Sequence, residues 1–204
     1  HLILLGWSPG EEHEVLTLGE AVRLFDISQM GDVQARFDIQ KLRHLNAEHI
    51  LRKKTEELLP LIKPFLEEAG IRSGALDEAF LARLIDLYKI RIKTLREFVE
   101  KTDFFFRDDF SVEEEARKKY LSDPSSSGRL RVLADRLTEL DRFSAPEIEN
   151  VFRGLAEELG VKPAALIHPA RLAVSGKTSG AGLFEMMELL GRDKVIERLR
   201  GRLP

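Results

Sequence analysis

The sequence predicts an all-α protein, and three observations lead to that prediction. Apolar residues recur at helical spacing through most of the chain, helix-start signals precede several of these runs, and no region is rich in strand-like alternation. In the clearest run, apolar residues between 148 and 159 follow the spacing i, i+3, i+4, i+7, i+8 and i+11, and Gly160 ends it. A short leading module should therefore precede an all-helical body.

Composition places the chain among soluble globular proteins and excludes several kinds of site. Its 204 residues can bury a substantial core as one large or two small domains, and 43% of them are hydrophobic. No apolar run approaches the ~20 residues of a membrane span. The absence of cysteine excludes disulfides, thiolate metal sites and thiol catalysis. Because the net charge is only −3, binding to nucleic acid would have to come from local basic patches.

The first 54 residues are expected to contain short helices. The chain starts HLILLGWSPG without a methionine or a basic leader, so we expect a cut inside a larger protein, with 2–7 as the end of a helix. Residues 17–20 form a capping box before a helix whose apolar face is Leu18, Val22 and Phe25. Residues 26–35 should be an extended connection. Asp38 is expected to cap one short helix and Asn46 the next.

From residue 55 onwards the expected helices are longer. The first should be kinked or broken at Pro60 or Pro64 before Gly70 ends it. Thr94 should cap another helix, and the aromatic run 104–106 should fill space between helices. A polar helix is expected from 111 to about 123, followed by a linker at 124–128. Further helices should start at 144–147 and after residue 193.

The stretch 168–185 reads HPARLAVSGKTSGAGLFE and predicts a helix, a glycine loop and a second helix. Pro169 can open the first helix, which should stop after Ser175. Three glycines at 176, 180 and 182 permit a tight loop that another molecule can approach closely. Although 176–178 reads Gly-Lys-Thr, it is not a nucleotide phosphate loop, because the glycine required five positions earlier is replaced by Arg171.

We find no catalytic or metal-binding pattern in the sequence. His44 and His49 are five residues apart without a third ligand, and the Gly-x-Ser-x-Gly elbow of serine hydrolases is absent. Acidic runs such as 113–115 are usual on solvated helix faces. A basic cluster at residues 89–96 is more suggestive, although such clusters are often ordinary surface.

Four segments together resemble bacterial glutamyl-tRNA synthetase, in that family's order and approximate spacing. They are LILLGWSPG at the start, RFDIQKLRHLN at 36–46, KTLREF at 93–98 and HPARLAVSGKTSGAGLFEMMELLG at 168–191. The resemblance implies the remainder of a stem-contact region at 1–54 and a two-part α-helical anticodon-binding domain, a helical cage, at 55–123 and 124–204. The family's Rossmann-type catalytic domain, with its His-Ile-Gly-His-like motif and lysine-serine-lysine loop, has no counterpart here.

The same resemblance implies particular binding residues. Arg91 matches the arginine that recognises the third anticodon base, a cytosine in glutamate tRNA where glutamine tRNA has guanine. Arg171 and the loop residues Gly180, Ala181 and Leu183 match those that hold the first two anticodon bases. At 180–183 relatives often have Thr-Pro-Gly-Leu or Gly-Pro-Gly-Leu, so this chain lacks their proline. Alternatively, Arg91 fills a surface patch or caps the preceding helix, and Leu183 belongs to the core.

The function implied is therefore that of a tRNA-binding region, with Lys89, Lys93 and Lys177 as phosphate contacts. Its partner would be glutamate tRNA, and no membrane would be involved. The protein would be a monomer in the cytoplasm. We expect no catalytic residue, metal or cofactor in this chain; ATP, Mg²⁺ and glutamate would be needed only by the parent enzyme. Two alternatives belong to other classes: a helical protein-interaction scaffold without specific RNA binding, and an independent enzyme.

Overall fold

The computed structural model of the chain describes residues 2–10, 15–31, 36–122 and 124–201, and every regular element in these ranges is a helix. This confirms the all-α prediction for the described residues. The α-helices are α1 (Leu18–Leu24), α2 (Ile39–Arg52), α3 (Thr55–Glu68), α4 (Glu78–Tyr88), α5 (Leu95–Phe106), α6 (Glu114–Tyr120), α7 (Pro124–Thr138), α8 (Ala145–Glu158), α9 (Ala164–Ser175), α10 (Leu183–Leu190) and α11 (Arg192–Leu199). Short 3₁₀ helices are η1 (Leu2–Leu5), η2 (Ile27–Gln29), η3 (Ser73–Ala75) and η4 (Lys89–Arg91).

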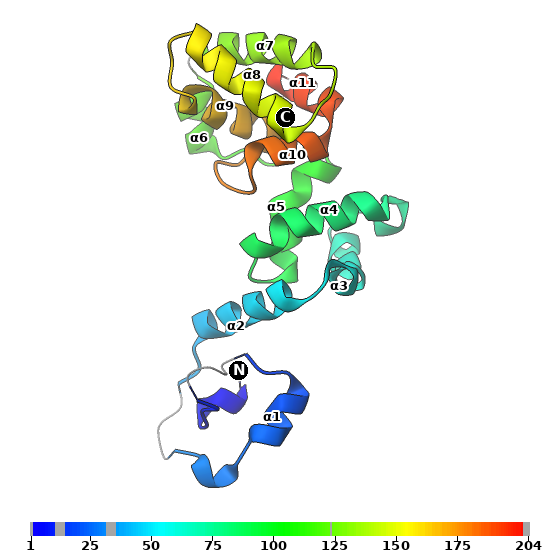
Figure 1. The fold of residues 1–204 in the computed structure, drawn as a ribbon, viewed down its shortest axis with the longest axis vertical. Helices are drawn as coiled ribbons and strands as arrows, with labels where there is room; N and C mark the ends of the chain where they lie inside the picture. The colour runs from blue at the N-terminus through cyan, green and yellow to red at the C-terminus, as the bar shows by residue number, and fades with distance from the viewer. Residues whose placement is uncertain (1, 11–14, 32–35, 123, 202–204) are drawn as a thin grey trace.

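The helices form an elongated molecule with three parts along its length (Figure 1). η1 and α1 lie at one end, and α2 leads from them to a middle part made of α3, α4 and α5. At the other end α7 packs against α11 and α9, and α8 packs against α10. Contacts of α10 with α4 and of α9 with α5 connect that end to the middle. A connected cluster of buried apolar residues extends from Ile50 to Leu199, whereas the domain boundaries at 54/55 and 123/124 stay predictions.

The leading module forms as expected locally but exposes its apolar face. Thr17 and Glu20 make the predicted capping box, which satisfies backbone N–H groups at the start of α1. Leu18 and Val22, however, are 83% and 71% exposed, and only Phe25 of this face contacts an aromatic ring, that of Trp7. The helical spacing of its apolar residues therefore predicted α1, but it did not predict which residues the apolar face of α1 contacts.

The predicted helix break at Asn46 is wrong, because α2 runs without interruption from Ile39 to Arg52. The Asn46 side chain instead donates from Nδ2 to the backbone oxygen of Lys93, 2.6 Å away. Arg43 forms an ion pair with Glu97 on α5. These polar side chains attach α2 to the junction between η4 and α5, a contact between distant segments that a local cap signal cannot predict.

The break predicted at Pro60 or Pro64 does not occur, whereas the kink named as its alternative stays a prediction. α3 continues through Pro60 and Pro64, which are both exposed, while its opposite face buries Leu58, Ile62 and Leu66. Carbonyl groups that lose a helical partner at an exposed proline can be met by water, and burial of the other face holds the helix together. α9 likewise begins at Ala164 and contains Pro169, so this proline does not open the helix.

The predicted linker at 124–128 is also wrong. Pro124 to Gly128 form the first turns of α7, and the Ser126 side chain is buried. A proline is accepted at the first position of a helix, because its missing N–H has no helical partner there. Small polar residues are typical of linkers, but here packing against the rest of the bundle decides the conformation.

Several predicted helix ends differ by smaller amounts. Residues 2–5 form a 3₁₀ helix instead of the end of an α-helix, and η2 interrupts the extended connection predicted at 26–35, of which 32–35 lie outside the described residues. The polar helix ends at Tyr120, and α11 starts at Arg192 instead of after residue 193. The predicted starts at 94 and 144 are confirmed, although the Ser144 side chain makes no capping hydrogen bond.

The aromatic residues 104–106, at the end of α5, fill space between helices in the middle of the molecule, as predicted. Phe104 and Phe105 are buried, and Phe105 makes edge contacts with Phe80 of α4 and with Tyr88 at the end of that helix. Aromatic pairs in this geometry contribute beyond the area that they bury. The cluster therefore fixes the C-terminal end of α4, where the predicted binding residues begin.

A buried arginine joins three helices near the predicted glycine loop. Arg198 of α11 is 3% exposed and donates to the backbone oxygens of Val174 in α9 (2.7 Å), Phe104 in α5 (2.9 Å) and Arg107 (3.1 Å). Burial lowers the pKa of its guanidinium, although hydrogen bonding to Asp108 opposes this effect. Because buried carbonyl groups need donors, this side chain satisfies groups that would otherwise be unpaired.

Gly176 ends α9 in the left-handed conformation, with φ of 70°. A Cβ atom at this position would lie 2.2 Å from the backbone oxygen of Ser111 and 2.9 Å from the Phe110 ring. The position thus needs glycine for two reasons, its dihedral angle and the close approach of the chain before α6.

Replacing Gly176 with alanine is expected to destabilise the fold by more than the same change at Gly160. Both glycines have positive φ, for which alanine costs about 1–2 kcal/mol, but nothing lies within 4 Å of a Cβ atom at Gly160. Urea unfolding of Gly176→Ala and Gly160→Ala measures the difference directly. Equal losses of unfolding free energy would show that the contact with Ser111 does not restrict residue 176.

Removing the guanidinium of Arg198 should be costly, whereas removing the charge of its carboxylate partner should not. Arg198→Met leaves three backbone oxygens without their donor, so we expect a loss of about 3 kcal/mol or more. Asp108→Asn should cost less than about 1 kcal/mol, since the Asp108 side chain is 82% exposed. Thermal and denaturant unfolding compare the two variants, and the reverse order would contradict this account.

Candidate nucleic-acid interface

Residues 176–182 form a loop between α9 and α10, and its first half is held by the segment before α6. Gly176 accepts a hydrogen bond at its carbonyl oxygen from the backbone of Glu113, 2.9 Å away. The Glu113 carboxylate in turn accepts from the backbone N–H (3.2 Å) and the hydroxyl (2.7 Å) of Thr178. Lys177 pairs with Asp103 of α5, with 3.2 Å between Nζ and Oδ1. These contacts fix the path of the loop as far as Thr178.

The second half of the loop is held by two arginines from different helices. Arg91, at the end of η4, donates from Nε to the backbone oxygen of Gly180 (3.1 Å) and from Nη1 to that of Leu87 (3.0 Å). Arg171 of α9 donates from Nη1 to the backbone oxygen of Ala181, 2.8 Å away. Residues separated by 80 positions in the sequence therefore meet at two adjacent peptide groups.

The charge at this place is positive. Burial lowers the pKa of the Arg171 guanidinium, an effect that nearby Arg91 adds to and that Tyr88 and Glu185 oppose. Arginine nevertheless remains protonated at neutral pH, so two cationic groups lie beside one loop. A guanidinium has five N–H donors, and the two hydrogen bonds of Arg91 leave three of them for a ligand.

Tyr88 lies beneath the loop. Tyr88 is 1% exposed, and burial raises its pKa to about 12, although the nearby guanidinium of Arg171 and the backbone of Ala181 oppose the shift. A Cβ atom on Gly180 would lie 3.7 Å from the Tyr88 hydroxyl oxygen. The phenol is therefore neutral at physiological pH and in contact with the backbone at the centre of the loop.

Of the five residues predicted for base recognition, all but Leu183 come together here, and their roles differ. Arg91 and Arg171 meet the loop at Gly180 and Ala181. Ala181 and Leu183 are 1% and 4% exposed, so their side chains belong to the core and only the backbone of Ala181 can take part in binding. The absence of the relatives' proline at 181 leaves a buried methyl group and an N–H in its place.

The loop tip presents polar groups to solvent. Thr178, Ser179 and Gly180 are exposed. Among the described residues, the backbone N–H groups of Ser179 and Gly180 have no hydrogen-bond partner. Free main-chain donors beside two guanidinium groups are suited to the acceptor edges of unstacked nucleobases.

The three lysines predicted to contact phosphate differ in their surroundings. Lys89 pairs with Asp86 and Lys177 with Asp103, so both charges already have a carboxylate nearby. Lys93 is exposed and has no ion pair among the described residues, while its backbone is held by Asn46 and Glu97. Of the three, Lys93 is the best placed to meet an external anion.

Three residues that position the loop were not predicted from the sequence. Tyr88 was part of an apolar helical pattern, Asp103 lies beside an aromatic run, and Glu113 belongs to an acidic run that indicated a solvated face. None carries a local signal for the loop, because each meets it only through the packing of α4, α5 and the segment before α6 against α9. An alignment of relatives could have found them.

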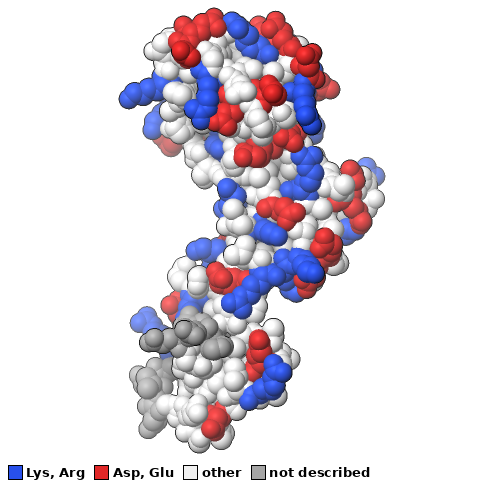
Figure 2. Space-filling model, viewed as in Figure 1, with Lys and Arg blue, Asp and Glu red and all other residues white. Residues whose placement is uncertain are grey.

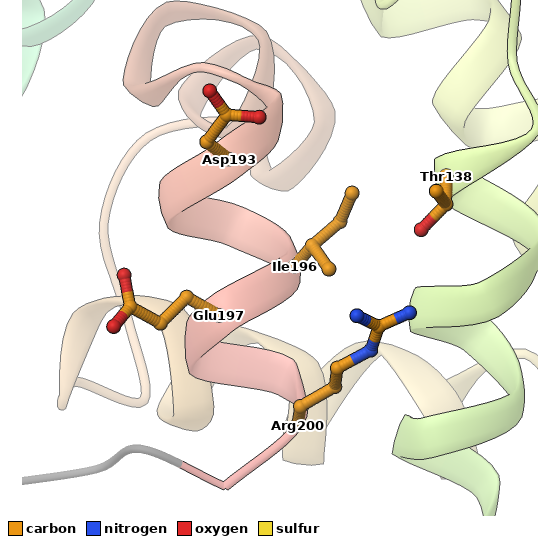
Figure 3. A pocket seen from close by; sticks show the side chains of 5 residues that line it. All are labelled: Thr138, Asp193, Ile196, Glu197 and Arg200. Atoms are coloured by element: carbon orange, nitrogen blue, oxygen red, sulfur yellow. The ribbon is translucent and has the colours of Figure 1, made fainter.

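No other part of the described chain offers an equally organised site. A cavity of about 400 Å³ lies between α7 and α11. In Figure 3, Ile196 of α11 and Arg200, which directly follows that helix, point towards the helix that carries Thr138, whereas Glu197 points away. Arg200 pairs with Asp135, and no predicted binding residue lines this cavity. The described residues contain no cluster suited to a metal ion and no helix long and apolar enough to span a membrane.

Charges of both signs are mixed over the face of the molecule in Figure 2, and no single basic surface dominates it. This agrees with the net charge of −3. Binding to nucleic acid would therefore depend on local groups such as the two arginines of the loop, and not on a field from the whole molecule.

Known proteins resemble this chain over most of its length. A family model described as an anticodon binding domain matches residues 57–203. Glutamate–tRNA ligase 2 of Caldicellulosiruptor saccharolyticus is 37% identical over 199 residues, which cover 98% of this chain and 41% of that protein. The glutamate–tRNA ligase of Desulforudis audaxviator is 35% identical over 204 residues, with the same coverage of 98% and 41%.

A solved structure has the same fold over nearly the whole chain. The crystal structure of a glutamate tRNA ligase from Elizabethkingia meningosepticum, in complex with its amino acid, superposes with a TM-score of 0.86 at 27% identity and covers 98% of this chain and 39% of its own. The chain thus spans about two fifths of the length of the curated relatives that it matches. Because the family model covers most of the chain, including the loop and both arginines, the protein belongs to the anticodon-binding domain family.

Proposed function

We propose that this chain is the tRNA-binding region of a glutamate–tRNA ligase and that it recognises the anticodon of glutamate tRNA. The observation that supports this most is the meeting of Arg91, Arg171 and the exposed loop tip at one place within the family match. The names of the relatives supply the amino acid and the tRNA.

Arg91 is the residue that we assign to the third anticodon base. Two of its donors rest on backbone oxygens, so the guanidinium is held in one orientation while three N–H groups stay free. Those groups match the O2 and N3 acceptors of an unstacked cytosine. The Watson–Crick edge of guanine would present N1–H and N2–H donors instead of these acceptors, which would leave guanidinium donors unpaired at a cost of about 1–3 kcal/mol.

Arg171 and the loop tip are assigned to the first two anticodon bases. The arginine orients the backbone at 181, and the free N–H groups of Ser179 and Gly180 supply donors for base edges. Lys93, and with it Lys89 and Lys177, would contact phosphates. These contacts would provide much of the affinity and make it depend on salt, whereas the bases provide discrimination.

The proposal leaves catalysis to parts of the enzyme that this chain does not contain. Formation of an aminoacyl ester needs ATP, Mg²⁺ and glutamate, and we propose that these bind to the catalytic part of the parent enzyme. We further propose that the parent enzyme is a cytoplasmic monomer and that this chain alone binds tRNA without charging it.

Replacing Arg91 with glutamine should abolish the preference for cytosine at the third anticodon position. We expect the parent chain to bind glutamate tRNA about 5- to 150-fold more tightly than a version with guanine there, and Arg91→Gln to bind both equally. Fluorescence anisotropy at fixed salt measures the four affinities. Arg153→Gln is the control, because it makes the same change at an exposed position of α8. This variant should keep the preference.

Two outcomes would contradict the proposal. If the parent chain binds both RNAs equally, Arg91 does not recognise the third base. If it binds neither RNA, the alternative of a helical interaction scaffold without RNA binding is favoured.

Replacing Lys93 with alanine should weaken binding to both RNAs by the same factor and lower the salt dependence. Loss of one phosphate contact reduces the slope of log K against log salt by about 0.7–0.9. Titrations at several salt concentrations give this slope. Lys162→Ala, at an exposed position between α8 and α9, should leave it unchanged; an equal change in both variants would show that Lys93 makes no specific contact.

A further inference from the structure

A second cavity, of about 310 Å³, lies among α6, α7, α9 and α11, and its charged lining is basic. Its volume is at the lower end of the range that is usual for small-ligand pockets. All four helices contribute residues to the wall, and the charged residues among them are Arg117, Arg131, Arg198 and Arg200. Of the residues that the structure describes, no aspartate or glutamate lines this cavity. The charge of its lining is therefore of one sign.

Carboxylate groups neutralise the exposed arginines of the cavity only weakly. Arg131 is exposed and has no ion pair with any described residue. Arg117 lies 4.0 Å from Glu114, and Arg200 lies 2.9 Å from Asp135. The side chains of these two acids are 69% and 67% exposed. Because water and salt screen such ion pairs, they contribute little, and the arginines can still attract an anion inside the cavity.

Arg198 adds a positive charge that is held in place. Its side chain is 4% exposed, and it donates to the backbone oxygens of Val174 (2.7 Å) and Phe104 (2.9 Å). Its carboxylate partner, Asp108, is 82% exposed and does not line the cavity. A charge in such a buried position is screened less by water than a surface charge, so it attracts a nearby anion more strongly.

The cavity uses different residues from the loop at 176–182. Ala173 of α9 lines the cavity, whereas Arg171, two positions earlier in the same helix, donates to the loop. Residues two positions apart do not share a helix face. No residue predicted for base recognition lines the cavity. A ligand in the cavity would therefore not need the groups that we assign to the anticodon.

We propose that this cavity is a binding site for a phosphate group. The planar guanidinium of arginine donates two parallel hydrogen bonds to phosphate oxygens, which makes arginine well suited to bind phosphate. The hydroxyl of Ser127, which also lines the cavity, is a further donor. A single carboxylate would match four cations less well, because it carries only one negative charge. The phosphate belongs either to a small phosphorylated molecule or to the RNA backbone.

Inorganic pyrophosphate is the probe, and calorimetric titration of the whole chain measures its binding. We expect one site per chain. Arg117→Gln and Arg131→Gln should each weaken binding about tenfold or more, since each removes a charge-assisted hydrogen bond from the site. Arg129→Gln is the matched control, because it makes the same change in α7 at a residue that does not line the cavity. This control should keep the affinity of the parent chain.

Binding of glutamate tRNA at several salt concentrations identifies the source of the phosphate. If the cavity holds a phosphate of the RNA backbone, Arg131→Gln should reduce the slope of log K against log salt by about 0.7–0.9 relative to Arg129→Gln. If the cavity holds a small phosphorylated molecule, the two variants should bind the tRNA with the same slope. Both results agree with a phosphate site, and they differ only in the molecule that carries the phosphate.

Two results of the calorimetric titration would overturn the proposal. The first is that pyrophosphate does not bind the parent chain. The second is that Arg131→Gln and Arg129→Gln have the same effect on its binding, which would show that the anion does not bind in the cavity. Neither result affects the assignment of Arg91, because that assignment is tested by the preference for cytosine over guanine.

Discussion

The position of the loop at 176–182 depends on the buried guanidinium of Arg198. This side chain donates to backbone oxygens of α5 and α9 and lies over the ring of Phe110, with 4.5 Å between its Cζ atom and the ring centroid. Phe110 is also the ring against which Gly176 packs at the start of the loop. A hydrophobic residue could fill the same space but could not pair three carbonyl groups, and these groups hold the end of α5 against the end of α9.

Side chains from neighbouring segments hold both halves of the loop, so the polar groups at its tip need not stabilise the loop itself. Glu113 and Asp103 hold its first half, while Arg91 and Arg171 hold the carbonyl groups of its second half. The tip between them keeps N–H groups without partners in the described structure. A loop that is ordered before binding loses less conformational entropy on binding, so more of the contact energy remains for affinity and discrimination.

Much of the fold follows from local patterns. The helical period, the caps at Thr17 and Thr94, and the glycines that end α8 and α9 each act over a few residues, and each cap or glycine predicted one end of its helix correctly. The errors at Asn46, Pro169 and 124–128 share one cause. A residue that disfavours helix in isolation costs up to about 3 kcal/mol, and burial of the neighbouring apolar face outweighs that cost.

The sequence by itself determined the helical class, the glycine loop and, through resemblance to known synthetases, the family and the two arginines. Only the tertiary structure decided that Arg91 and Arg171 share one loop, that Ala181 and Leu183 are buried, and that Asp103 and Glu113 hold the loop in place. The physical reason is that these contacts join residues far apart in the chain. Their geometry depends on how α4, α5 and α9 pack, which no local pattern encodes.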